Sequence, residues 1–218
     1  MKRKGFIFDL DGVIVDTAKY HFLAWKSLAN GLGIDFSEKE NEQLKGVSRV
    51  RSLEKILSWG NTSLPEEEFN RLMAQKNEDY LKYIDDMDDS ELLPMVKETL
   101  EALKEAGQGI ALGSASKNAR HIIDKVHVTS YFDAIVDGND VTKAKPDPEV
   151  FLNAAKLLGI DAEDCIVFED SVAGVQAANI AGMISIGIGS AEVLHEAHYV
   201  FKDFTEISSS FISDLIKN

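Results

Sequence analysis

Two carboxylates stand at the end of the first apolar run of the chain. Residues 6–8 are Phe, Ile and Phe, and Asp9, Leu10, Asp11 and Gly12 follow. A strand buried on both faces does not tolerate unpaired carboxylates, because removing them from water is costly. Asp9 and Asp11 therefore lie at the exit of the strand or face a cation, while Gly12 permits a sharp turn. Taken alone, the pair is equally compatible with an acidic surface turn.

Two further segments, which follow the apolar runs 110–113 and 134–136, contain residues that suit a phosphate group. Residues 114–118 (Ser, Ala, Ser, Lys, Asn) follow the run 110–113. A small hydroxyl residue with free N–H groups at a helix start suits a phosphate oxygen, although Ser is also a routine N-cap. Lys145 stands before Pro146, in a turn that could hold its ammonium on a phosphoryl group. An exposed loop lysine is the alternative for Lys145, as it is for Lys143.

A third group of charges ends the apolar run 165–168. Glu169 and Asp170 are adjacent carboxylates that need a cation if the strand is buried. Together with Asp9 they would form the hard oxygen site that Mg²⁺ prefers. The alternative is that Asp170 caps the next helix while Glu169 lies in solvent.

The elements that must position these residues are predicted from periodicity and breakers. After residue 94, strands alternate with helices, which predicts an α/β fold with a parallel sheet and helices on both faces. In such a sheet, ligands bind at the carboxyl ends of the strands. The expected strands are 110–113, 134–136, 165–168 and 184–188, and the expected helices are 96–107, 119–128, 148–158, 171–181 and 206–217.

The region between the first strand and residue 88 shows helical spacing only. Its expected helices are 17–30, 38–46, 49–59 and 65–84. The acidic run 85–89 and residues 15–17 are expected to connect an inserted cap to the main domain. We therefore expect residues 1–16 and 89–218 to form the core domain and residues 17–88 to form a helical cap domain.

Composition narrows the function classes. The 218 residues carry a formal net charge of −14, with 44% hydrophobic and 28% charged residues. This balance indicates a globular chain and argues against nucleic acid or an anionic membrane surface as a partner. The single cysteine, Cys165, is expected to be a buried, inert thiol in a reducing cytoplasm. No apolar segment approaches the roughly 18 residues that a membrane span needs.

The four motifs, in this order, resemble the haloacid dehalogenase-like (HAD) phosphotransferases along the whole chain. The resemblance implies a Rossmann-like core with an inserted all-helical cap. It implies that Asp9 is the nucleophile and Asp11 the general acid/base, the second of which a true dehalogenase lacks. It further implies that Ser114 and Lys145 hold the phosphate, helped by backbone N–H groups of Ser114 and Ala115. One Mg²⁺ per chain would be held by Asp9, Asp11, Glu169 and Asp170.

Within that superfamily the cap resembles the β-phosphoglucomutases. The stretches that carry this likeness are H-F-x-A-W-K, N-E-Q-L-K-G-V-S-R, S-L-x-K-I-L, K-N-x-x-Y and, in the core, S-A-S-K-N. Considered alone, His21 is more often structural on such a helix, and Lys76 is typical of a surface lysine. The resemblance instead implies roles in the acid/base step and hinge for Thr17, His21 and Lys76. It implies substrate contacts for Trp25, Gly46, Val47, Ser48, Arg49, Ser52, Ala115, Ser116, Lys117 and Asn118.

Two positions depart from the pattern of this family. Pro94-Met95 stands where these proteins often have Pro-Gly, and Val172 occupies a variable position after Asp170. Neither position touches a group expected to take part in catalysis.

The implied reaction converts β-D-glucose 1-phosphate to glucose 6-phosphate. It would proceed through an aspartyl-phosphate enzyme, with β-D-glucose 1,6-bisphosphate as intermediate and activator. A cap that closes only on a bound sugar phosphate would keep water from the phosphoenzyme. We expect a monomer with a small-molecule sugar phosphate as its partner. The alternatives are a sugar-phosphate phosphatase and a non-catalytic sugar-phosphate sensor.

Overall fold

The computed structural model describes residues 3–44 and 47–217, and the chain divides into two compact units. Met1–Asp16 and Asp88–Asn218 form the core unit, and Thr17–Met87 form the cap unit. The boundary expected after residue 88 lies one residue earlier. Asp88 belongs to the core because its carboxylate accepts the N–H of Ser90 and caps the 3₁₀ turn η1 (Asp89–Glu91).

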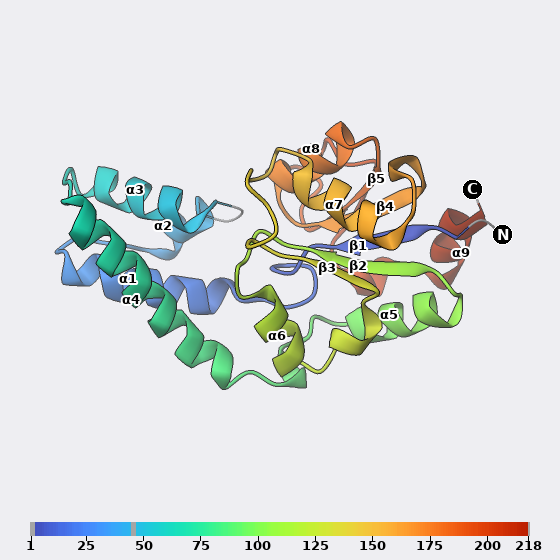
Figure 1. Cartoon of the computed structure of the whole chain (residues 1–218), viewed down its shortest axis with the longest axis horizontal. Coiled ribbons are helices and arrows are strands. Elements are labelled where there is room, and N and C mark those ends of the chain that lie inside the picture. Colours follow the sequence, from blue (N-terminus) through green and yellow to red (C-terminus); the bar gives the residue numbers. More distant parts are fainter. Residues whose placement is uncertain (1–2, 45–46, 218) are drawn as a thin grey trace. The chain divides into compact units, whose positions relative to one another are not determined.

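A parallel sheet forms the centre of the core unit (Figure 1). Its order is β3-β2-β1-β4-β5-β6, so β1 lies in the middle and the strand order reverses between β1 and β4. Every neighbouring pair of strands is parallel. The strands are β1 (Gly5–Phe8), β2 (Gly109–Gly113), β3 (Ala134–Val136), β4 (Cys165–Glu169), β5 (Ile184–Ile188) and β6 (Tyr199–Phe201). This architecture confirms the predicted α/β class.

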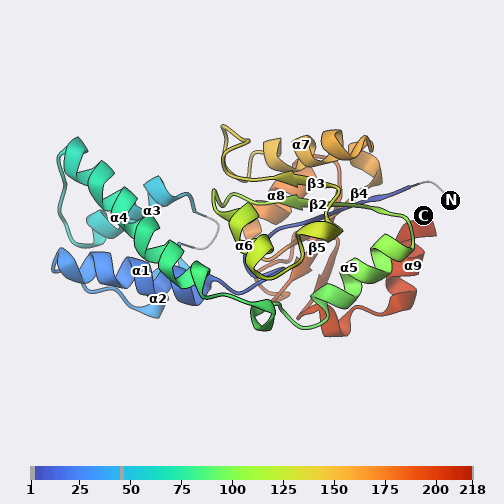
Figure 2. The ribbon, with the colours of Figure 1, turned by 60° about the horizontal axis from the view of Figure 1, so that its bottom comes forward.

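Helices cover both faces of the sheet, as a parallel sheet requires. Figures 1 and 2 show α7 and α8 on one face and α5 and α9 on the other. The core helices are α5 (Val96–Glu105), α6 (Ala119–Lys125), α7 (Glu149–Leu158), α8 (Val172–Ile180) and α9 (Ser209–Lys217). Short 3₁₀ turns η2 (Thr129–Tyr131), η3 (Ala162–Asp164) and η4 (Phe204–Glu206) lie between them.

The two faces of β1 pack against different groups. Phe6 and Phe8 share one face, and the ring centroid of Phe8 lies 4.7 Å from that of Phe168 on β4. Phe204 lies 5.3 Å from Phe168 and extends this aromatic cluster. Ile7 points to the opposite face, where it joins the apolar cluster beneath α7 and α8. All five side chains are buried, so packing on both faces of β1 fixes the position at which Asp9 begins.

In the described part of the cap unit, helices are the regular secondary structure, and loops connect them. These helices are α1 (Ala18–Gly31), α2 (Glu38–Glu42), α3 (Arg49–Trp59) and α4 (Glu66–Asp85). One side of each longer helix is apolar. Trp25, Leu53 and Ile56 belong to the hydrophobic core of the cap unit. The predicted helix 38–46 is too long, because α2 ends at Glu42.

Sheet and helix ends in the core differ from the prediction in three further places. Strand β6 was not predicted, although Val200 pairs in register with Gly187 of β5. The helix expected from residue 206 begins at Ser209, after η4. The helix expected to reach residue 128 ends at Lys125, since His127 adopts a left-handed conformation with φ of 55°.

The two chain segments that lead to the cap meet within the core unit. Val15 forms an antiparallel bridge with Leu92, and the N–H of Leu93 donates to the carbonyl of Ile14 at 2.9 Å. The chain therefore leaves and re-enters the core unit through paired backbone, while a hinge at this place stays a prediction.

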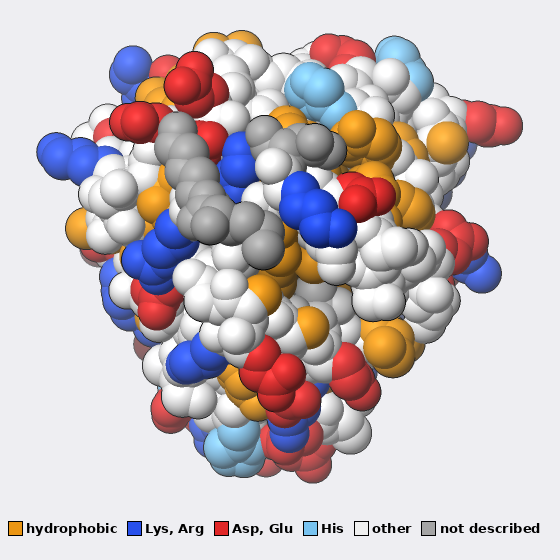
Figure 3. Space-filling model, turned by 90° about the vertical axis from the view of Figure 1, so that its right-hand side faces the viewer, with side chains coloured by type: hydrophobic (Ala, Val, Ile, Leu, Met, Phe, Trp, Pro, Cys, Tyr) orange, Lys and Arg blue, Asp and Glu red, His pale blue; other side chains and the backbone are white. Residues whose placement is uncertain are grey.

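The core surface near α9 carries acidic and basic side chains interspersed with small hydrophobic areas (Figure 3). A cavity of about 420 Å³ lies at the amino ends of β1 and β2, among Arg3, Gln108 and Lys217. Cys165 is buried, and burial raises the pKa of its thiol to about 11. Within the part of the chain that is described, no helix combines the length and apolar character needed to cross a membrane.

Met95 sits in a backbone conformation that favours glycine. It precedes α5 with φ of 64°, and its side chain is 45% exposed. The Cβ of an L residue is strained in this region by roughly 1 kcal/mol or more. We expect Met95→Gly to raise the free energy of unfolding by about 0.5–1 kcal/mol, which is about 1–4 °C in Tm for a chain of this size.

Thermal unfolding followed by circular dichroism measures this shift. Met95→Ala is the matched control, because it removes the same side chain but keeps the Cβ. The explanation by backbone strain fails if Met95→Ala stabilises the protein as much as Met95→Gly does.

Candidate active site

The candidate site begins where β1 and β4 end. Asp9 follows β1, and its N–H donates to the carbonyl of Phe168 at 3.0 Å, so it continues the ladder towards Glu169 at the end of β4. Both carboxylates are buried. The strand order reverses between β1 and β4, and this switch point is where doubly wound sheets bind their ligands.

Lys145 joins the two carboxylates. Its Nζ lies 2.6 Å from Oδ1 of Asp9 and also contacts Oε1 of Glu169. The ammonium lies 4.7 Å from the ring centre of Phe151, and its side chain is 4% exposed. Lys143, two residues earlier, pairs with Asp147 at the surface. Of the two lysines, the structure therefore brings Lys145 to the buried carboxylates.

Burial and crowding of charge shift the pKa values here. Burial, reinforced by the charges of Glu169 and Asp11, raises the pKa of Asp9 to about 7 although Lys145 opposes the shift. Burial and the charge of Glu169 raise the pKa of Asp170 to about 8. Burial disfavours the charged form of Lys145, but Asp9 and Glu169 outweigh it and raise its pKa. The site holds more buried carboxylate than its lysine neutralises.

Two glycines allow the carboxylates to pack against backbone. A Cβ on Gly12, whose φ is 78°, would lie 2.1 Å from Oδ2 of Asp170. A Cβ on Gly174 would lie 1.9 Å from Glu169, whose Oε2 also accepts the N–H and hydroxyl of Ser171. Any other residue at these two positions would displace a carboxylate of the site.

Asp11 lies in the turn that follows β1. It is half-buried and forms a parallel bridge with Val15, while the N–H of Gly12 donates to the carbonyl of Val15 at 2.7 Å. Its charge contributes to the raised pKa values of both Asp9 and Asp170. The turn thus brings the second carboxylate of the motif within electrostatic range of the first.

Residues 114–118, which we call the phosphate loop, follow β2. The buried Ser114 accepts the N–H of Ser116 at 3.1 Å, and the hydroxyl of Ser116 accepts the N–H of Asn118 at 3.2 Å. Ala115 and Lys117 are exposed. One expectation is wrong: the N–H of Ser114 donates to the carbonyl of Val136, because it extends the pairing of β2 with β3. That N–H is therefore not directed at a ligand.

The cap unit brings three of the expected residues together. Nζ of Lys76 on α4 lies 2.8 Å from Nδ1 of His21 on α1. The same ammonium lies 4.7 Å from the ring centre of Trp25 and 4.6 Å from that of Tyr80. Lys76 is buried, so these contacts replace much of its hydration. Burial, with the nearby charges of Lys76 and Arg49, lowers the pKa of His21 well below its usual value.

The remaining cap residues lie around the start of α3. Ser48 caps this helix and is exposed, whereas Ser52 is buried and its hydroxyl lies 3.5 Å from the carbonyl of Val47. Arg49 donates to Oδ1 of Asn77 at 2.7 Å, and burial lowers its pKa. Gly46 lies outside the described residues. Thr17, at the boundary between the units, is buried at the N-cap of α1.

The carboxylates of the core suit a hard divalent cation. Their oxygens are ligands that Mg²⁺ prefers, and the raised pKa values of Asp9 and Asp170 reflect buried negative charge that a cation would offset. Among the described residues, no group of three or more His, Cys, Asp or Glu side chains is arranged to hold a metal ion. The fit therefore rests on donor chemistry and charge.

Several residues of these clusters were not predicted. Tyr80 stacks on His21 with ring centroids 4.2 Å apart, and Asn77 binds Arg49. Both belong to the K-N-x-x-Y stretch, of which only Lys76 was singled out, so their signal was present in the sequence. Phe151 and Ser171 carry no comparable signal, because their contacts with Lys145 and Glu169 depend on the folded sheet.

Comparison with known proteins places these features in a family. Residues 3–182 match the family described as haloacid dehalogenase-like hydrolase. A β-phosphoglucomutase of Bacillus subtilis is 40% identical over 97% of this chain and 94% of its own length. A crystal structure of β-phosphoglucomutase from Clostridium difficile matches with a TM-score of 0.93 at 40% identity, over 99% of this chain and 98% of that one.

A phosphatase also belongs among these relatives. The fructose-1-phosphate phosphatase of Escherichia coli is 30% identical over 84% of this chain and 95% of its own length. The predicted resemblance to the β-phosphoglucomutases is confirmed, and phosphoryl transfer is the chemistry that these relatives share. The chain belongs to the haloacid dehalogenase-like hydrolase family and is an enzyme of its phosphotransferase branch.

Proposed function

We propose that this enzyme converts β-D-glucose 1-phosphate to glucose 6-phosphate through β-D-glucose 1,6-bisphosphate. The observation that carries the proposal is the buried contact of Lys145 with Asp9 and Glu169 at the switch point of the sheet. A cation fixed beside a carboxylate in this way suits attack on a phosphoryl group. The names and the 40% identity of two relatives support the choice of sugar and of isomerisation.

In the proposed reaction, one oxygen of Asp9 attacks phosphorus and forms an aspartyl-phosphate. The bond between phosphorus and the departing sugar oxygen breaks, and Asp11 donates a proton to that oxygen. Lys145 offsets charge on the transferring oxygens, and the N–H of Ala115 is the remaining candidate donor from the phosphate loop. In the second half, Asp11 takes the proton of the attacking sugar hydroxyl while the phosphoryl group leaves Asp9.

Mg²⁺ would be held by Asp9, Asp11, Glu169 and Asp170. When bound, it would neutralise phosphoryl oxygens and keep Asp9 ionised. The protein itself would still orient the phosphoryl group. Lys145 follows β3 and the phosphate loop follows β2, so the two would contact the group from separate segments.

In the cap, we propose that Arg49 binds the distal phosphate and that His21 and Lys76 act with Asp11 in the acid/base step. The half-buried guanidinium of Arg49 has five N–H donors, more than its bond to Asn77 uses, as recognition of a phosphate requires. The second candidate function is a sugar-phosphate phosphatase, in which water accepts the phosphoryl group. The 30% identity to a fructose-1-phosphate phosphatase favours keeping it.

The first prediction from the proposed function separates these two candidate functions by their products. With Mg²⁺, β-D-glucose 1-phosphate and a trace of the bisphosphate, we expect glucose 6-phosphate to form with little free phosphate. Coupled assays of both products in one reaction measure the ratio. Release of phosphate without glucose 6-phosphate would establish the phosphatase, and the absence of both products would contradict enzymatic action on this sugar.

The second prediction concerns the covalent step. Asp9→Asn should reduce turnover by at least about 10³-fold, because an amide is not a nucleophile towards phosphorus. Acid-quenched mass spectrometry should detect an added phosphoryl group on the parent enzyme and none on the variant. Asp35→Asn, at an exposed position of the cap unit, is the matched control and should behave as the parent. Substantial turnover by Asp9→Asn would exclude a phosphorylated Asp9.

The third prediction concerns the charge of His21. Its folded pKa lies below the unfolded value near 6.5, so the stability due to its neutral form is present above pH 6.5 and is lost as the pH falls. An NMR titration should show His21 still neutral at pH 6. Lys76→Met should raise this pKa because it removes a neighbouring cation, whereas Lys82→Met, an exposed lysine on the same helix, should not. Protonation of His21 near pH 6.5 in the parent would contradict the assignment.

A further inference from the structure

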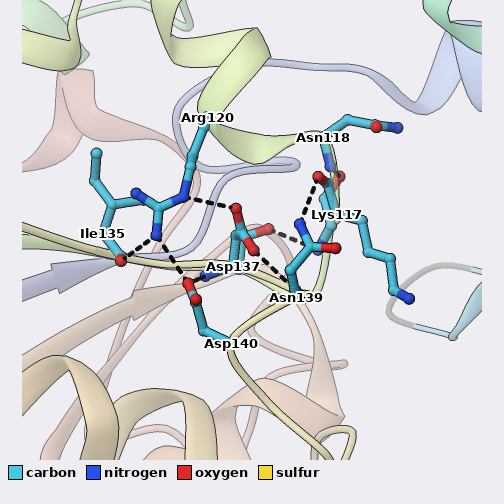
Figure 4. Close-up of polar contacts among 9 residues, drawn as sticks. Lys117, Asn118, Arg120, Ile135, Asp137, Asn139 and Asp140 are labelled. Atoms are coloured by element: carbon cyan, nitrogen blue, oxygen red, sulfur yellow. Dashed lines mark hydrogen bonds and ion pairs between the residues drawn. The ribbon is translucent and has the colours of Figure 1, made fainter.

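The phosphate loop is held by a second loop, which we call the clamp loop (residues 137–140). The N–H of Gly138 donates to the carbonyl of Ser116 at 3.1 Å. The side-chain amide of Asn139 donates to the carbonyl of Lys117 at 3.1 Å, as Figure 4 shows. Two successive peptide groups of the phosphate loop are thus oriented by the clamp loop. The clamp loop follows β3 and lies upstream of Lys145.

The clamp loop owes its own shape to two carboxylates. Oδ1 of Asp137 accepts the N–H of Asn139 at 2.8 Å, and Oδ2 of Asp140 accepts the N–H of Asp137 at 3.0 Å. Arg120 then connects both carboxylates (Figure 4): Nε donates to Asp137 at 2.9 Å, and Nη2 donates to Asp140 at 2.8 Å and to the carbonyl of Ile135 at 2.9 Å. Asp137 is 1% exposed, so its charge depends on these donors.

These contacts form a closed circuit. The phosphate loop leads directly into α6, whose second residue is Arg120. Arg120 returns to the clamp loop, and the clamp loop returns to the carbonyl groups of Ser116 and Lys117. A guanidinium presents its donors in a rigid planar fork, so the circuit permits little displacement of either loop.

Gly138 lies at a close approach of the two loops. A Cβ at this position would lie 2.3 Å from the carbonyl oxygen of Ala115. Its φ lies outside the left-handed region, so the backbone itself would accept alanine. Since the obstructing atom is backbone, an added methyl group must displace the phosphate loop.

We infer that Arg120, Asp137 and Gly138 are positioning residues that set the phosphate loop for its contacts with the transferring phosphoryl group. The inference rests on the proposed function, in which this loop binds phosphate. None of the three residues needs to touch the substrate. They act through the carbonyl groups of Ser116 and Lys117 and through the space left beside Ala115.

Asp137→Asn tests the circuit with a side chain of nearly the same size. If the single oxygen of the new amide keeps the bond to the N–H of Asn139, its NH₂ group faces the Nε–H of Arg120, and that hydrogen bond is lost. In calorimetric titrations with Mg²⁺, performed well below Tm, the Kd for inorganic phosphate should rise about tenfold. The kcat for hydrolysis of p-nitrophenyl phosphate should fall on the order of 10- to 100-fold.

Two other variants keep the inference testable if Asp137→Asn does not fold. Arg120→Lys keeps the charge but cannot span both carboxylates, and Gly138→Ala displaces the loop sterically, so both should weaken phosphate binding. Asp133→Asn is the control for Asp137→Asn, because Asp133 pairs with Arg3 at 2.7 Å and precedes β3, at the end of the strand opposite to Asp137. Gly31→Ala is the control for the added methyl group, since a Cβ there has no neighbour within 4 Å.

The outcomes separate this inference from the proposed function. Loss of phosphate affinity in the three folded variants, with both controls unchanged, supports the inference even if the parent forms no glucose 6-phosphate. Parent-like phosphate affinity in the folded variants overturns it, even if Tm falls and the parent is a mutase. In that case the circuit would serve stability alone.

Discussion

The structure depends on one constraint: an excess of negative charge is buried away from solvent at the carboxyl ends of β1 and β4. Asp9, Glu169 and Asp170 converge where β1 and β4 end, with one lysine among them. Such a cluster persists only if the surrounding structure holds it, because an ionised carboxylate has a lower free energy in water than in a buried site. The sheet, the close packing at Gly12 and Gly174, and the ammonium of Lys145 all act against that tendency. The charge imbalance that they maintain raises the pKa values of Asp9 and Asp170, and it is the reason for proposing a cation at this place.

The scaffold resists that tendency through its buried strands. Phe8 and Phe168 stack in register on neighbouring strands, one residue before the carboxylates that follow them. Hydrophobic packing therefore sets the positions of the charges. The phosphate loop is held differently, by hydrogen bonds to the clamp loop. Apolar packing thus positions the residues at the strand ends, and hydrogen bonds position the phosphate loop.

Strand ends were predictable because their pattern is local. The step from apolar residues to Asp9 and the step to Glu169 each mark an exit from a buried strand, and the structure has both. Strand β6 was missed because Tyr199, Val200 and Phe201 form a short, half-exposed edge that only pairing with β5 defines. The N–H of Ser114 was misassigned because a ladder one residue longer than expected uses it. Arg120 and Asp137 were missed because no spacing in the sequence indicates a contact between separate loops.

The central position of β1 has a consequence for synthesis of the chain. This strand is made first, but its partners β2 and β4 begin at residues 109 and 165. At 5–20 residues per second, the second partner follows β1 after roughly 8–32 s, since 165 minus 5 is 160 residues. Throughout that interval, an apolar segment of high β-propensity remains without its sheet on the ribosome. The acidic residues that follow the strand oppose its association with other chains during that interval, because charges flanking an apolar segment disfavour intermolecular pairing.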